Sequence, residues 1–152
     1  MNRIRIAIAL CAAISVVAAL ATVSSAADKK LYAKMSGKQE RPTGDPNGTG
    51  TAVLTFKTRQ VCYVIRPRNV QSPIAAGHIH TGRRGVAGDV FITLWSTPKQ
   101  IRNGALTGCS KTVRAADLAK VRAKPSNYYL NIHNAQFGPG AIRGQLTATK
   151  PR

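Results

Sequence analysis

Short runs of alternating apolar and polar residues, separated by glycine and proline turns, recur along most of this chain and most constrain its fold. In the segment KKLYAKMSG (29–37), Leu31, Ala33 and Met35 alternate with Tyr32 and with polar or charged residues. A period of two is typical of a strand with one buried face. Further strand segments are predicted at 51–67 (two strands around a turn at 58–60), 77–80, 88–95, 104–110 (a short strand or a turn), 127–134 and 140–150.

One segment has helical spacing instead. In TVRAADLAKVRAKP (112–125), Ala115, Leu118 and Val121 recur every three residues, and Pro125 ends the pattern. About eight short strands and one short helix predict an all-β fold, an antiparallel β-sandwich or barrel. We find no repeat and no second domain, so the sequence predicts one domain over residues 30–150.

The first residues carry the features of a secretory signal. Arg3 and Arg5 precede an apolar run from Ile6 to Leu20, and small residues follow up to Ala27. This pattern predicts a signal peptide over residues 1–26, cleaved after Ala26 or Ala27, and a secreted or periplasmic protein. An uncleaved membrane anchor is the alternative, but the run is shorter than the roughly 20 apolar residues of a span. No transmembrane segment is expected after cleavage.

Cleavage would leave two cysteines, Cys62 and Cys109, because Cys11 belongs to the signal. Two cysteines in an oxidising compartment most simply form one disulfide. Two separate buried thiols are the alternative. Neither residue belongs to a CxxC motif, which disfavours a redox-active or zinc-thiolate role.

The chain is strongly basic, with 23 Lys+Arg against 5 Asp+Glu and a formal charge of +18. Without the two signal arginines, 21 cations and about +16 remain. Such a charge attracts polyanions, and for an exported protein we expect anionic envelope polymers or lipid headgroups as partners. Nucleic acid is disfavoured, since few aromatic residues accompany the scattered cations. A solvated surface without a specific partner is the alternative.

Four separated segments resemble one family. They are MSGKQERPTGDPNGTGTAVLTF (35–56), AGHIHTGRRGVAGDVFITLW (76–95), AADLAKVRAKPSNYYLNIHN (115–134) and FGPGAIRGQL (137–146). Together they make the chain similar to the CHRD domain, named from chordin and common as a stand-alone exported bacterial protein. The resemblance implies an immunoglobulin-like β-sandwich and no agreed enzymatic activity. Asp89 departs from the family, which usually has proline there, and the basic charge is heavier than expected for it.

The three histidines of the chain all lie in these family segments. His78 and His80 are two residues apart in a predicted strand, so their side chains point to the same face. With His133 from another strand they could form a three-nitrogen site for copper or zinc. The GHIH segment also resembles the metal-binding strand of copper–zinc superoxide dismutases. No fourth histidine exists, so only a copper-only analogue is compatible with the sequence. Alternatively, the imidazoles only bond neighbouring backbone groups.

Arg143 lies in the predicted strand segment AIRGQL and would need a partner if buried. Asp89 and Glu40 are the possible partners for a structural ion pair, and contact with a ligand is the second interpretation. We identify no catalytic residues, because the chain has no GxSxG, no HExxH and no phosphate-cradling loop. The sequence therefore predicts a non-enzymatic binding or structural module with a basic surface, and alternatively a metal-binding protein.

Overall fold

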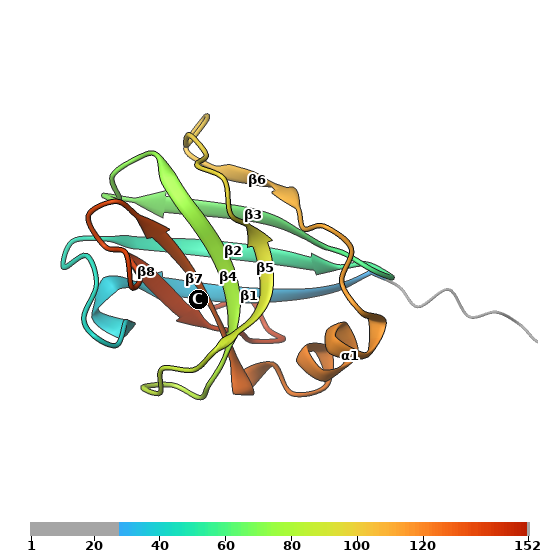
Figure 1. The fold of residues 1–152 in the computed structure, drawn as a ribbon. Coiled ribbons are helices and arrows are strands. Elements are labelled where there is room, and N and C mark those ends of the chain that lie inside the picture. Colours follow the sequence, from blue (N-terminus) through green and yellow to red (C-terminus); the bar gives the residue numbers. More distant parts are fainter. Residues whose placement is uncertain (1–27, 152) are drawn as a thin grey trace, which may run out of the picture.

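Eight strands pair into one antiparallel sheet in the computed structural model, which describes residues 28–151 (Figure 1). The strands are β1 (Lys29–Ser36), β2 (Thr49–Phe56), β3 (Val61–Arg68), β4 (Ile74–Thr81), β5 (Val90–Trp95), β6 (Leu106–Cys109), β7 (Tyr128–Asn134) and β8 (Ile142–Gln145). Their order in the sheet is β5-β4-β7-β8-β1-β2-β3-β6. The expected all-β antiparallel fold is confirmed. The predicted signal segment 1–26 lies outside the described residues.

The sheet bends so that its two halves face each other across one hydrophobic core (Figure 1). Strands β1, β2, β3 and β6 form one half, and β4, β5, β7 and β8 form the other. Alternate residues of both halves point inward, for example Leu31 and Leu54 from the first half and Ile79 and Leu130 from the second, all fully buried. The period-two pattern of the sequence thus produces the sandwich-like core.

The edge strand β5 contacts β3, the neighbour of the other edge strand β6, where the two halves meet. Tyr63 of β3 stacks on Trp95 of β5, with ring centroids 4.8 Å apart. Gly77 of β4 makes room for this ring, because a Cβ atom there would lie 2.2 Å from Trp95. The sheet is therefore nearly closed like a barrel, and the aromatic pair seals the remaining side.

One α-helix, α1 (Ala115–Ala123), lies at the end of the sheet where β1 begins and β2 turns into β3 (Figure 1). Leu118 and Val121 of α1 are fully buried in the core. The helix is shorter than the predicted 112–125, because the amide of Val113 bonds the carbonyl of Arg59 and keeps the preceding residues extended. Two short 3-10 turns, η1 (Gly37–Gln39) and η2 (Pro125–Asn127), complete the fold. Within residues 28–151 no helix has the length and apolar character needed to span a membrane.

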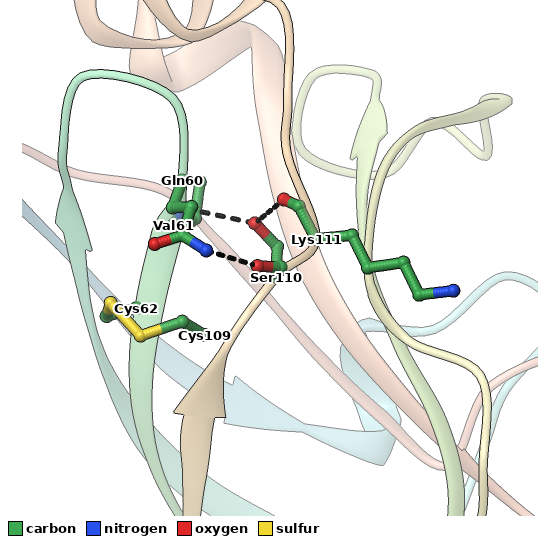
Figure 2. Close-up of a disulfide and its surroundings, with 6 residues drawn as sticks. All are labelled: Gln60, Val61, Cys62, Cys109, Ser110 and Lys111. Carbon is green, nitrogen blue, oxygen red and sulfur yellow. Dashed lines mark hydrogen bonds between the residues drawn. A yellow bond between two sulfur atoms is a disulfide. The ribbon is translucent and has the colours of Figure 1, made fainter.

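A disulfide between Cys62 and Cys109 joins the edge strand β6 to β3 (Figure 2). The two cysteines face each other in the strand register. Next to them, the buried hydroxyl of Ser110 accepts the amide proton of Val61 at 3.1 Å and donates to the carbonyl of Lys111 at 2.8 Å (Figure 2). The alternative of two separate thiols is therefore wrong. Besides this disulfide, only the pairing of its four residues with β3 attaches β6 to the sheet.

We expect the double variant C62A/C109A to lose roughly 3–4 kcal/mol of unfolding free energy, the loop-closure value for a bridge spanning 47 residues. The reason is that the unbridged unfolded chain gains entropy, and β6 loses its covalent tie. Urea unfolding followed by fluorescence of Trp95 would measure the loss, with reduced wild type as the matched control. A loss of unfolding free energy below about 1 kcal/mol, in both the double variant and the reduced wild type, would contradict a stabilising role of the disulfide.

Candidate metal centre

The strand register places polar side chains in a row on the outer face of the sheet. His78 of β4 lies opposite Asn131 of β7, Asn131 opposite Arg143 of β8, and Arg143 opposite Ser36 of β1. Since alternate residues of a strand point to opposite faces, these side chains point away from the core. The outer face of β4, β7 and β8 is therefore a polar surface.

The predicted metal ligands meet on this surface. His78, His80 and His133 each offer one ring nitrogen, and these three atoms lie within 4.8 Å of one another. The closest pair is Nδ1 of His78 and Nε2 of His133, 3.0 Å apart. His80 is buried, and the other two rings are half-buried. The spacing of two in β4 and the diagonal neighbour in β7 bring the rings together, as the sequence predicted.

Backbone carbonyls fix the tautomers of two of these rings. Nδ1 of His133 lies 2.7 Å from the carbonyl oxygen of Gly138, and Nδ1 of His80 lies 2.9 Å from that of Gly88. A carbonyl oxygen only accepts hydrogen bonds, so both Nδ1 atoms carry the proton and both Nε2 atoms present a lone pair. Metal-binding histidines are oriented by this kind of second bond.

The Nε2 lone pairs of His80 and His133 lie close to other side chains of the cluster. Nε2 of His80 is buried and has no hydrogen-bond partner among the described residues. Nε2 of His133 lies 3.0 Å from His78 Nδ1, which donates to it, and 3.1 Å from Oδ1 of Asn131. Because Oδ1 only accepts hydrogen bonds, an unprotonated Nε2 requires the Asn131 amide to be turned so that its NH₂ group faces the ring. A metal ion could take the place of this shared proton if the proton moves to Nε2 of His78, because the ring then stays neutral and offers its Nδ1 lone pair.

Burial favours the neutral form of His78 and His133. Removal from water, together with the neighbouring His133 and His80, lowers the pKa of His78 to about 4. The pKa of His133 is lowered mainly by the same burial, although its bond to Gly138 opposes the shift. Neutral rings are the form that binds metal, so these two lowered pKa values favour metal binding.

A loop over residues 82–89 closes one side of the cluster. The Tyr129 hydroxyl bonds both the amide and the carbonyl of Gly88, at 3.3 and 3.4 Å. Gly82, at the start of the loop, has a φ of +137°, which side chains rarely adopt. The glycines of the GRRG region thus hold the loop in the position where its carbonyl meets His80.

Tyr129 links the cluster to Arg143. The ring of His80 stacks on Tyr129, with centroids 4.9 Å apart and planes at 9°. The guanidinium of Arg143 lies 4.5 Å from the same ring, on the side of β8. Arg143 also donates from Nε to the carbonyl of Gln39 and from Nη1 to that of Val86, the latter at 3.1 Å. Tyr129 had no predicted role, because a single tyrosine in a strand gives no signal of its own.

Arg143 is buried, but it forms neither of the ion pairs that the sequence suggested. Within residues 28–151 no carboxylate of Asp89 or Glu40 lies within 4.0 Å of it, and backbone carbonyls take their place. Its Nη2 atom is buried without a partner in this part of the chain.

Glu40 is the buried acid nearest to this group. Burial raises its pKa to about 7, against the opposing effects of the Arg143 charge and of hydrogen bonds from Asn131 and the backbone of Arg41.

Comparisons with known proteins agree with the segments quoted above. A family model described as the CHRD domain matches residues 31–146. No curated protein and no solved structure matches the chain.

The raised pKa of Glu40 predicts a pH-dependent stability. Between pH 4.5 and about 7 the folded chain retains a proton that the unfolded chain has lost, so this group lowers stability as pH rises. We expect E40Q to raise the unfolding free energy at pH 8 by roughly 2–3 kcal/mol and to change it little at pH 4.5, since one pKa unit is worth about 1.4 kcal/mol.

Urea unfolding at several pH values would measure this difference, with the exposed Asp89→Asn as control. His78 gives a slope of opposite sign in all three proteins, so the difference between variants isolates Glu40. A parallel pH dependence of E40Q and wild type would contradict the assignment.

Proposed function

This chain belongs to the CHRD domain family, and we propose that it is an exported, non-enzymatic binding module that holds one copper or zinc ion on His78, His80 and His133. The observation that carries this proposal is the convergence of three imidazoles, two of which, His80 and His133, have their tautomers set by backbone carbonyls. Bonding to the backbone uses only Nδ1 of His80 and His133. It does not account for the convergence of one further nitrogen from each of the three rings.

The donor set narrows the choice of ion. Three imidazole nitrogens suit zinc and copper, and the Irving–Williams order favours copper where both are present. Nitrogen-to-metal distances of roughly 2.0–2.1 Å require the three nitrogens to lie about 3–4 Å apart, so small turns of the rings suffice. No carboxylate or thiolate belongs to the cluster within residues 28–151, which disfavours harder ions such as calcium.

An open coordination position would remain after three protein ligands bind. With copper, such a site could cycle between two oxidation states, as in a copper-only relative of the dismutases. This activity is secondary to the proposal, and an assay for superoxide dismutation becomes informative only once copper binding has been measured.

Calorimetric titration of the chain from Asp28 onward, treated with chelator, tests the proposal. We expect one Cu²⁺ or Zn²⁺ per chain. We expect H78A to weaken binding at least 100-fold, because loss of a ligand costs more than the 10–100-fold typical of an outer-shell residue. The ring of His78 bonds no backbone group, so this variant disturbs the fold less than the other two would.

Thr93→Ala is the matched control, since Thr93 is exposed and lies opposite His78 in the register of β4 and β5. It should bind metal like the wild type. Failure of the wild type to bind either ion, or equal binding by H78A, would contradict a metal centre and leave the histidines a structural role.

A second candidate function comes from the basic surface. A groove of about 640 Å³ crosses the outer face of β1, β2 and β3. Its cationic lining consists of Lys34, Lys38, Arg66, Arg68 and Arg84, and no acidic residue lines it. In a secreted or periplasmic protein such a groove would attract anionic envelope polymers or lipid headgroups.

Binding of this kind should weaken steeply with salt, because exposed charges are screened within about 8–10 Å at physiological ionic strength. We expect an anionic polysaccharide such as polygalacturonate to bind at 20 mM NaCl and to lose at least tenfold in affinity at 200 mM. Fluorescence anisotropy with labelled polymer would measure it. Affinity that does not change with salt would contradict a role of the basic surface.

A further inference from the structure

A small cavity of about 100 Å³ adjoins the basic groove on the outer face of the sheet. Its lining consists of Lys38, Gln39, Arg41, Arg84, Gly85, Arg143 and Gln145. Lys38, Gln39 and Arg84 line the groove as well, so the two spaces lie next to each other. Four cations therefore surround a space that is large enough for one small anionic group.

The strand register explains why the cavity and the groove share one face. Arg143 of β8 lies opposite Ser36 of β1, Ser36 opposite Thr49 of β2, and Thr49 opposite Arg68 of β3. Ser36, Thr49 and Arg68 line the groove. A ligand that follows this row across the strands would end at Arg143.

Arg143 differs from the surface cations around it. Its side chain is 3% exposed, and two backbone carbonyls and the ring of Tyr129 fix the plane of its guanidinium. The remaining terminal nitrogen, Nη2, is buried without a partner among the described residues. Buried donors are nearly always hydrogen-bonded in folded proteins, so an open donor on a residue that lines this cationic cavity points to an absent acceptor.

We propose that this cavity binds a single phosphate group and that the groove holds the chain that carries it, so that the ligand is a phosphate-rich polymer. The proposal rests on the second candidate function above, anion binding by the basic surface, and identifies its ligand. The terminal phosphate of such a polymer has close to two negative charges at neutral pH and each internal phosphate has one, and both kinds accept several hydrogen bonds from guanidinium groups. A carboxylate would balance only one of the four cations.

Glu40 does not supply the missing negative charge. It is buried beside Arg143, but its raised pKa of about 7 leaves it largely protonated below neutral pH. Its own Oε1 atom has no partner within residues 28–151, which confirms that it does not pair with the open nitrogen of Arg143. The positive charge of the cavity is therefore available to a ligand.

Calorimetry with metal-free protein at a fixed 150 mM NaCl tests the proposal. The probes are inorganic phosphate, long-chain polyphosphate and acetate, and vesicles of phosphatidylglycerol form a separate arm. We expect polyphosphate to bind tightest, inorganic phosphate to bind weakly, and acetate to give no heat. The variant K38A/R84A removes two exposed cations of the cavity and should weaken both phosphate probes at least tenfold.

The matched control is K57A/R59A, which removes the same charge from the exposed turn between β2 and β3, at the other end of these strands. It should weaken polyphosphate less than about twofold. Equal weakening by both double variants would overturn the proposal that the cavity binds phosphate, but not the proposal that the basic surface attracts anions. Absence of polyanion binding even at 20 mM NaCl would overturn both proposals. Binding to vesicles but not to polyphosphate would overturn the assignment of a polymer.

Discussion

Burial of strand β7 on both of its faces is the constraint on which the rest of this structure depends. β7 lies between β4 and β8, and its inner residues Leu130 and Ile132 belong to the hydrophobic core. Its outer residues Tyr129 and Asn131 are equally buried, yet they are polar. Buried polar groups need partners, so loops must cover the outer face and offer their backbone groups to it. The carbonyls of Gly88, Gly138, Gln39 and Val86 do this for His80, His133 and Arg143.

The loops do not supply a hydrogen-bond partner for every buried polar atom of this face, and the atoms left over could bind ligands. Four buried side-chain atoms of the described residues lack a hydrogen-bond partner, and three of them lie on or beside this outer face: Glu40 Oε1, His80 Nε2 and Arg143 Nη2. Each unsatisfied buried group costs stability, roughly 1–3 kcal/mol in ordinary cases. A metal ion at His80 and an anion at Arg143 would satisfy two of the three. Because Tyr129 contacts both side chains, the two proposed sites share one structural support.

Much of the fold could be predicted from alternation alone. The segments around Leu31, Ile65 and Ile92 became strands because their apolar side chains fill one core. The spacing of His78 and His80, with a third histidine in another strand, also sufficed to predict the cluster. What the sequence could not show was the arrangement of the loops. No local pattern indicates that Gly88 and Gly138 would accept from the imidazoles, since this depends on how the two loops turn back onto the strands. Nor does one indicate that Arg143 would bond carbonyls in place of an acid, since those contacts join residues distant in sequence.

The tautomers of the three histidines in the metal-free protein test the central claim most directly. Long-range ¹H–¹⁵N correlation spectra report which ring nitrogen carries the proton. At pH 7 we predict that Nδ1 carries a proton in His80 and His133 and that one equivalent of Zn²⁺ shifts their Nε2 signals. Rings that are protonated on Nε2, or positively charged, and that do not respond to zinc would contradict the claim that their lone pairs converge on a metal site.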